Sequence, residues 1–298
     1  MIDRQNIESE FKNLQDRICK GLENLDGLGR FRQDLWHREK GGGGRTRIIQ
    51  SQHIEKGGVN FSAVMGDMPE RISKALGLGP NRFFATGVSI VLHARNPHVP
   101  IIHMNVRYFE TSEGPWWFGG GIDMTPHYII DKDAAQFHRS LKETCDKYDH
   151  AWYPEFKKWA DDYFYLKHRN ETRGIGGIFF DRMDSKRASK DRLFDFVIDV
   201  GDSFLDCYSE VFNKYSDKAY TEREKEWQLH RRGRYVEFNL VWDKGTRFGL
   251  DTGGNIESIL MSLPPECRWT YSYDYNKIEL DTLNKLKKDI DWLSRTAE

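Results

Sequence analysis

Residues 102–107 alternate apolar and polar side chains. Along a strand, successive side chains point to opposite faces, so His103, Asn105 and Arg107 would share one face and their apolar neighbours the other. A polar face that opposes an apolar core face suits ligand binding. A solvent-facing antiparallel sheet alternates in the same way, so spacing alone leaves both interpretations open.

The preceding segment extends this pattern. Residues 83–109 are rich in β-branched and aromatic residues and are interrupted by the turn-like residues 96–100, which predicts two adjacent antiparallel strands. The two strands would together present one polar surface, made of Ser89, His93, His103, Asn105 and Arg107.

A single acid, Asp123, lies among aromatic residues and glycines in residues 116–126, most of which are predicted to form another strand. Apolar surroundings make a buried carboxylate costly unless it binds a partner, so Asp123 is a candidate for chemistry. The alternative is a turn or strand-end aspartate that caps backbone amides.

Clusters of basic residues offer further candidates, because arginine forks suit carboxylates. Four glycines at residues 41–44 precede Arg45 and Arg47 and predict a flexible loop that brings cations to a ligand, or simply a mobile surface loop. The other basic positions are Arg169, Arg173, Arg231, Arg232 and Arg234. Surface or ion-pair roles are the commoner fate of such arginines.

The sequence carries no cofactor fingerprint. Neither G-x-x-x-x-G-K-[ST] nor G-x-G-x-x-G occurs, which removes the best support for phosphate or dinucleotide binding. The four cysteines form no C-x-x-C pair and are expected as reduced thiols. A metal site would have to use the histidines of structured segments, whose spacing is not a metal signature, so structural roles are favoured. These histidines are His93, His103, His138 and His168.

Charge and hydropathy limit the partners. Lys and Arg total 45 against 46 for Asp and Glu, a formal net charge of -1, so there is no bulk basic field for nucleic acid. No uninterrupted apolar run approaches the ~20 residues of a membrane helix, so no transmembrane segment is expected. The first residues resemble neither a secretory signal nor a mitochondrial presequence, which predicts a cytoplasmic protein.

Helices are predicted around the strands without regular alternation. Residues 5–26 carry apolar positions at three- and four-residue spacing and predict an N-terminal helix. Further helices are expected within residues 131–170, around 194–212, after the capping-box pair Thr221 and Glu224, and around 280–293. Residues 234–242 are expected as a strand, and residues 257–263 as a strand or a buried helical turn.

This irregular order favours an α+β fold, a large antiparallel sheet flanked by helices on both faces, over a doubly wound parallel fold. No composition break or internal repeat is present. Residues 1–298 are therefore expected to form one domain, with the N-terminal helix at about 5–26 and the catalytic sheet and helices at about 30–298.

Taken together, these residues resemble the aerobic, oxygen-dependent coproporphyrinogen III oxidase family, over residues 36–292. Several of the matching segments are long and uncommon, which makes chance a poor explanation. They are residues 41–45, 59–62, 102–109, 116–126, 153–177, 231–242 and 256–264.

The resemblance implies a broad, flat antiparallel sheet flanked by helices, a homodimer, and a cleft closed by loops. The implied substrate is coproporphyrinogen III, a reduced tetrapyrrole with four propionates. Two of these propionates are oxidatively decarboxylated to vinyl groups, which gives protoporphyrinogen IX in haem biosynthesis.

The resemblance also implies roles for individual residues by position. His103 matches a proposed proton donor, Asp123 the acid that contacts the pyrrole nitrogens, and Arg107 a holder of propionates. The implied substrate-contacting residues are Ser89, Asn105, Val106, Arg107, Gly253, Gly254 and Asn255, of which the last three lie near the implied dimer-forming region.

The implied chemistry agrees with the missing cofactor motifs. A porphyrinogen is electron-rich, so the substrate itself can give electrons to molecular oxygen, the co-substrate, while a propionate loses carbon dioxide. No redox cofactor is then required, and hydrogen peroxide is the implied oxygen product. Two alternatives stay open: a divalent-metal-dependent oxidase in which the four histidines converge, and a non-catalytic tetrapyrrole carrier whose arginines bind carboxylates.

Overall fold

A seven-stranded antiparallel sheet forms the centre of the protein, in a computed structural model that describes residues 2–68, 70, 73–74, 77–112, 114–251 and 254–295. The strand order is β1-β2-β3-β4-β5-β6-β9, so each strand up to β6 pairs with its neighbours in sequence. The strands are β1 (Arg32–His37), β2 (Gly42–Ile49), β3 (Ile54–Asp67), β4 (Arg82–Ala94), β5 (Ile101–Thr111), β6 (Trp116–Thr125) and β9 (Gly177–Met183). A separate two-stranded hairpin is made of β7 (Tyr165–Leu166) and β8 (Glu171–Thr172).

Helices lie on both faces of this sheet, as the sequence predicts. They are α1 (Arg4–Asp26), α3 (Asp131–Asp146), α4 (Trp152–Tyr163), α5 (Lys190–Tyr215), α6 (Glu222–Glu237), α7 (Lys244–Asp251), α8 (Ile256–Leu260) and α9 (Lys277–Lys285), with a π-helical turn η1 (Phe238–Trp242). Within the described ranges, no helix combines the length and apolar character needed to cross a bilayer.

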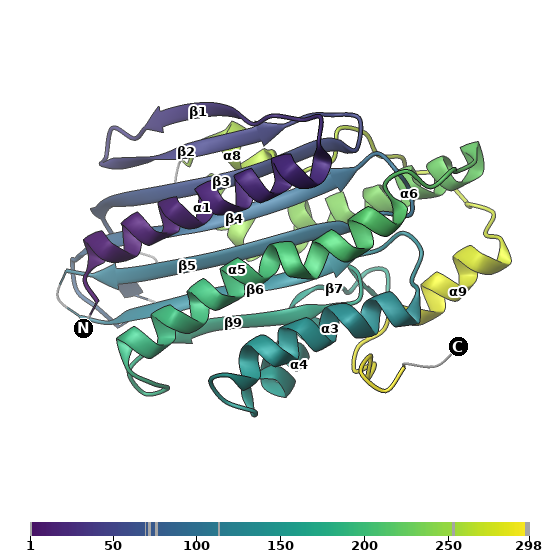
Figure 1. Ribbon diagram of the computed structural model, residues 1–298. Helices are drawn as coiled ribbons and strands as arrows, with labels where there is room; N and C mark the ends of the chain where they lie inside the picture. The colour runs from purple at the N-terminus through teal and green to yellow at the C-terminus, as the bar shows by residue number, and fades with distance from the viewer. Residues whose placement is uncertain are drawn as a thin grey trace.

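The core lies between the sheet and the pair α1 and α5, which cross the same face of the sheet side by side (Figure 1). The predicted apolar stripe of α1 is confirmed: Ile7, Phe11 and Leu14 are completely buried. Alternate residues of the central strands, such as Val88 and Val106, meet these helices from the sheet. Burial of this continuous apolar surface is the main stabilising contribution to the fold.

The strands predicted at residues 83–109 and 116–125 are confirmed as β4, β5 and β6. Their antiparallel register pairs Ser89 with Asn105 and His103 with Asp123. The alternation that the sequence shows therefore corresponds to two real faces, one apolar against α1 and α5, and one polar.

The strand predicted at residues 234–242 is wrong. α6 starts at the predicted capping box, where the Thr221 N–H donates to the Glu224 carboxylate at 2.7 Å and the Glu224 N–H donates to Thr221 Oγ1. The helix continues through Glu237 and then widens into the π-helical turn η1. Residues 227–236 are all buried, so this part of the helix has no exposed face and its sequence shows no separate polar stripe at helical spacing. Its aromatic and β-branched residues are also typical of a buried strand, which explains the wrong prediction.

The flexible loop predicted at residues 41–44 is also wrong. This glycine run lies mostly within β2, which is paired on both sides. Arg45 and Arg47 both form ion pairs with Asp16 of α1, at 2.9 and 2.6 Å. These two cations therefore join β2 to α1 instead of facing a ligand.

Other helices are confirmed, but their observed ends differ from the predicted ones. The helices expected within residues 131–170 are α3 and α4, but α4 ends at Tyr163 and the β7–β8 hairpin follows. Residues 257–260 belong to α8, so the helical alternative holds for them, but α8 buries none of its residues and the expected burial is wrong. The C-terminal helix α9 ends at Lys285, and the chain beyond it turns to bury Trp292 against His138.

Four histidines, His93, His127, His138 and His230, are buried and have a lowered pKa. His138 of α3 is hydrogen bonded to the Ile175 carbonyl at 2.9 Å, and burial lowers the pKa of His138 to about 3. Burial, reinforced by the positive charge of Arg232, lowers the pKa of His93 and of His127 well below the ordinary value. Between the folded and the ordinary pKa the unfolded chain binds more protons than the folded one, so stability must fall as the pH falls through this window.

We therefore expect the free energy of unfolding to decrease as the pH is lowered from about 7 toward about 4, by about 1.4 kcal/mol per pH unit for each such histidine. His138→Gln should remove one histidine's share of this slope. His150→Gln is the control, because that side chain is 86% exposed. Urea unfolding across the pH range measures both slopes, and equal slopes for wild type and His138→Gln would contradict the assignment.

Candidate active site

The structure brings four predicted residues together on the sheet face that α1 and α5 leave free. Ser89 of β4 lies beside Asn105 of β5, and His103 and Arg107 flank Asn105 on the same face. All four are partly exposed. We call this surface, defined by Ser89, His103, Asn105 and Arg107, the polar face.

Val106 does not share the polar face. Its side chain points to the opposite side of the sheet and is completely buried in the core. Any contact between Val106 and a ligand on the polar face would have to come from its backbone. His93 lies farther along β4, buried edge-on against Tyr235 with ring centroids 5.3 Å apart.

The short helix α8 covers the β3 side of the polar face. The Asn60 side chain of β3 donates to the Ser258 carbonyl at 2.6 Å, and Met261 packs directly over Gly58. Asn255 caps α8 by accepting a hydrogen bond from the Ser258 N–H at 3.0 Å. The predicted substrate-binding residues Gly254 and Asn255 thus precede a helix that lies on this face, whereas Gly253 falls outside the described residues.

The opposite side of the polar face is bounded by β9 and α4. Phe179 of β9 pairs in register with Gly121 and stacks on Tyr163 of α4, with ring centroids 4.2 Å apart. Tyr163 in turn donates to Asp243 at 2.8 Å. An aromatic surface therefore adjoins the polar face, which suits a ligand that combines flat rings with carboxylates.

Asp123 is the centre of a deeply buried polar cluster. Its Oδ1 accepts hydrogen bonds from His103 Nδ1 and from Arg173 Nη2, both at 2.7 Å, and Arg173 also donates to Oδ2 at 2.8 Å. The side chains of Asp123 and Arg173 are only 1% and 2% exposed, while that of His103 is 22% exposed. These contacts are all with side chains, so Asp123 is not the backbone-capping aspartate of the alternative interpretation.

The electrostatics of this cluster favour the ionised acid. Burial alone would raise the pKa of Asp123, but the Arg173 charge and the His103 hydrogen bond outweigh burial and hold that pKa below its ordinary value. Burial alone would likewise lower the pKa of Arg173, and the Asp123 carboxylate overcomes it. Asp123 is thus a fixed negative charge behind His103, and a weak proton acceptor in its own right.

Arg173 itself is held by an aromatic cage. Its guanidinium carbon lies 4.3, 4.6 and 4.8 Å from the ring centroids of Phe164, Phe238 and Tyr235. Asn239 accepts a further hydrogen bond from its Nη1 at 2.9 Å. From the sequence, Arg173 is only one basic residue among several. The cage is assembled from Phe164, just after α4, and from α6 and η1, which lie about 60 residues further along the chain.

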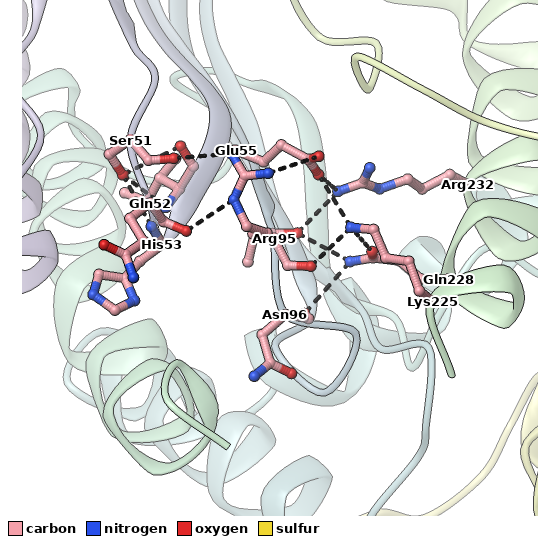
Figure 2. A network of polar contacts seen from close by, with 11 residues as sticks. Ser51, Gln52, His53, Glu55, Arg95, Asn96, Lys225, Gln228 and Arg232 are labelled. Atoms are coloured by element: carbon pink, nitrogen blue, oxygen red, sulfur yellow. Dashed lines mark hydrogen bonds and ion pairs between the residues drawn. The ribbon is translucent and has the colours of Figure 1, made fainter. Parts of the chain in front are cut away.

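The basic segment at residues 231–234 is occupied by internal ion pairs. Arg231 binds Glu171 at 3.0 Å and Arg234 binds Glu237 at 2.9 Å. Arg232 is completely buried and donates to Glu55 at 2.6 Å, and Figure 2 shows Glu55 drawn between Arg232, Lys225 and Arg95. Arg231 and Arg232 thus join α6 to β8 and β3, whereas Arg234 pairs within α6. All three arginines have carboxylate partners inside the protein.

The four histidines of the metal alternative have separate partners. His103 binds Asp123, and His168 binds Glu237 at 2.7 Å. His93 is bonded to the Ser262 carbonyl at 2.9 Å and His138 to the Ile175 carbonyl. Among the residues that the structure describes, no group of three or more His, Cys, Asp or Glu side chains is arranged to hold a metal ion.

A groove of about 600 Å³ lies between the N-terminal halves of α1 and α5, on the far side of the sheet from the polar face. Its lining includes the acids Glu10, Asp195 and Asp199. Such a surface repels carboxylates, so this groove is a poor site for an anionic ligand.

A partly exposed histidine backed by a buried ion pair, beside an arginine and an aromatic surface, is an arrangement of the kind that enzymes use on anionic ring compounds. Residues 6–292 match the family described as Coproporphyrinogen III oxidase. Two relatives named oxygen-dependent coproporphyrinogen-III oxidase, from Prochlorococcus marinus strains MIT 9312 and MIT 9301, are each 46% identical over 320 residues, which covers 98% of this chain and 93% of each relative. The chain belongs to the coproporphyrinogen III oxidase family.

Removing the buried cation should destabilise the protein strongly. Arg173→Met leaves the Asp123 charge uncompensated in the interior, which should cost about 3–5 kcal/mol of unfolding free energy. Arg169→Met is the control: Arg169 pairs with Glu237, but its side chain is 38% exposed, so its loss should lower the unfolding free energy by less than about 1 kcal/mol. Urea unfolding compares the two variants, and a similar loss in both would show that burial of the Asp123 pair carries no special weight.

Proposed function

We propose that the polar face catalyses the oxygen-dependent oxidative decarboxylation of two propionates of coproporphyrinogen III to vinyl groups, which gives protoporphyrinogen IX. The observation that carries this proposal is the His103–Asp123–Arg173 cluster beside Arg107, in a chain that belongs to the coproporphyrinogen III oxidase family. The names of its relatives, which specify oxygen dependence, support molecular oxygen as the co-substrate.

The chemistry of each step balances without a redox cofactor. One propionate, one O2 and one proton give one vinyl group, one CO2 and one H2O2. The propionate loses CO2 and the equivalent of a hydride, and the two electrons and that hydrogen pass to oxygen. Because the electron-rich pyrroles can supply the electrons, the protein has to bind and orient the substrate and manage one proton.

Arg107, Ser89 and Asn105 bind the substrate in this proposal. The guanidinium of Arg107 is 36% exposed and suits a propionate carboxylate, while the two short polar side chains accept and donate hydrogen bonds on the same face. Gly254 and Asn255, which directly precede α8, lie beside this face and make further contacts with the substrate in this proposal. Gly253 is included on the basis of the sequence.

His103 meets the substrate and moves the proton. Of the pair His103 and Asp123 only the histidine is exposed, so it is the group that a ligand on the polar face would touch first. The Asp123 carboxylate accepts from Nδ1, which fixes the ring orientation and stabilises an imidazolium. The same negative charge stabilises positive charge that grows on the pyrroles as electrons leave, and direct contact with the pyrrole N–H groups would need the carboxylate to emerge from beneath His103.

Asp123→Asn tests this role. The amide is nearly isosteric but carries no charge, so kcat should fall by a factor on the order of 100, with a smaller change in substrate binding. Asp161→Asn is the control, because Asp161 is also buried and ion-paired, with Lys157 at 2.5 Å, but lies on α4. Turnover per folded molecule should survive in the control, and near-normal kcat in a destabilised Asp123→Asn protein would end the catalytic role.

A second experiment separates the alternatives of a metal-dependent oxidase and a carrier. Purified protein incubated in air with coproporphyrinogen III should release CO2 and form vinyl groups, and thorough chelator treatment should leave the rate unchanged. A carrier would bind the substrate and release no CO2. Loss of activity on chelation, with recovery on adding one divalent ion, would replace this proposal with a metal-dependent one.

The homodimer, the cytoplasmic location and the single domain over residues 1–298 are further parts of the proposal. One hydrophobic cluster that includes both Ile7 and Trp292 supports a single domain, because the two ends of the described chain contribute to the same core.

A further inference from the structure

The arginine assigned to propionate binding already has an anion beside it. Arg107 Nη2 donates to Asp181 Oδ1 of β9 at 2.9 Å, and Nη1 donates to Asn105 Oδ1 at 2.8 Å. The Arg107 and Asp181 side chains are 36% and 33% exposed, so both are accessible to a ligand. An arriving carboxylate therefore meets a guanidinium whose charge is already compensated.

The backbone of β9 is irregular at Asp181, and this irregularity directs the Asp181 side chain toward Arg107. Phe118 pairs with Met183, and Gly120 pairs with Phe180, so the two residues Asp181 and Arg182 oppose the single residue between them on β6. This is a β-bulge, a feature that redirects side chains and is frequent beside active sites. Arg182 has φ 51°, a left-handed conformation that disfavours a residue with a side chain.

Gly119 supplies the space that the ion pair fills. A Cβ atom at Gly119 would lie 2.6 Å from Asp181 Oδ1 and 2.9 Å from Arg107 Nε, closer than real side chains allow. Any other residue at this position would push the two charged groups apart. The bulge, the left-handed residue and the missing side chain thus favour the same contact.

We propose that Asp181 is a substitute for the substrate carboxylate. In the free enzyme it holds Arg107 in place on the polar face, and a propionate that binds Arg107 takes over from Asp181. Because the propionate must displace Asp181, the substrate binds more weakly than it would bind an unpaired Arg107. After the reaction Asp181 pairs with Arg107 again, which favours release of the product. This inference rests on the proposed role of Arg107 in propionate binding.

Asp181→Asn isolates the competition. Asparagine retains an oxygen that can accept from Arg107, so the guanidinium stays positioned, but the competing charge is gone. The dissociation constant of coproporphyrin III, the oxidised tetracarboxylate, measured by fluorescence, should fall about 2- to 5-fold, the range that a partly exposed ion pair supports. The KM for coproporphyrinogen III should fall similarly, kcat should not rise, and the difference from wild type should shrink at high salt.

Asp202→Asn is the matched control. Asp202 forms a comparable exposed pair with Arg17 on the far side of the sheet, at 3.0 Å, so the net-charge change is the same without an effect on the polar face. Unchanged or weaker coproporphyrin binding by a folded Asp181→Asn protein overturns the exchange.

Arg107→Lys distinguishes this failure from failure of the proposed function. If Arg107 binds a propionate, the lysine variant binds coproporphyrin more weakly, because an ammonium lacks the bidentate fork. Weaker binding in Arg107→Lys without tighter binding in Asp181→Asn rejects the exchange alone. Unchanged binding in Arg107→Lys rejects the propionate site and the exchange together.

Discussion

The ion pair between Asp123 and Arg173, buried in a layer of aromatic rings, is the interaction on which the site depends. Neither charge tolerates the interior without the other, and each has few alternative partners there. The pair joins β6 to the segment between β8 and β9, and Asn239 extends it to η1. A displacement of β6 or of the segment that carries Arg173 would leave a charge uncompensated, so the electrostatic environment of His103 depends on how these two parts pack together.

One face of the sheet carries the apolar core, and the other carries the candidate site. One face buries Val88 and Val106 against α1 and α5 and supplies the apolar core. An antiparallel sheet can leave its other face polar, because its backbone hydrogen bonds are satisfied within the sheet itself. The short α8, Tyr235 of α6 and the aromatic residues near β9 bound that face, while Ser89, His103, Asn105 and Arg107 stay partly exposed. A rigid floor of this kind holds side chains more accurately than a loop does.

Most arginines near this region are already bound to carboxylates. Arg231 and Arg232 tie α6 to Glu171 and Glu55, and Figure 2 shows how several cations gather around Glu55. With a formal net charge of -1, the chain has no surplus of positive charge to attract a ligand with four carboxylates. Recognition of such a ligand therefore depends on a few placed groups and on exchange of partners, not on a long-range field.

The sequence by itself determined the elements that bury one face. α1, β4 and β5 were predictable because Phe11 and Val106 fall on regular apolar stripes, and the same period of two put His103, Asn105 and Arg107 on one surface. α6 was not predictable in its second half, because burial on all sides erases the stripe. Only the tertiary structure decided the partners: Arg173 for Asp123 and Asp181 for Arg107 come from other elements, and the pairing of such distant charges is set by sheet topology, which no local pattern records.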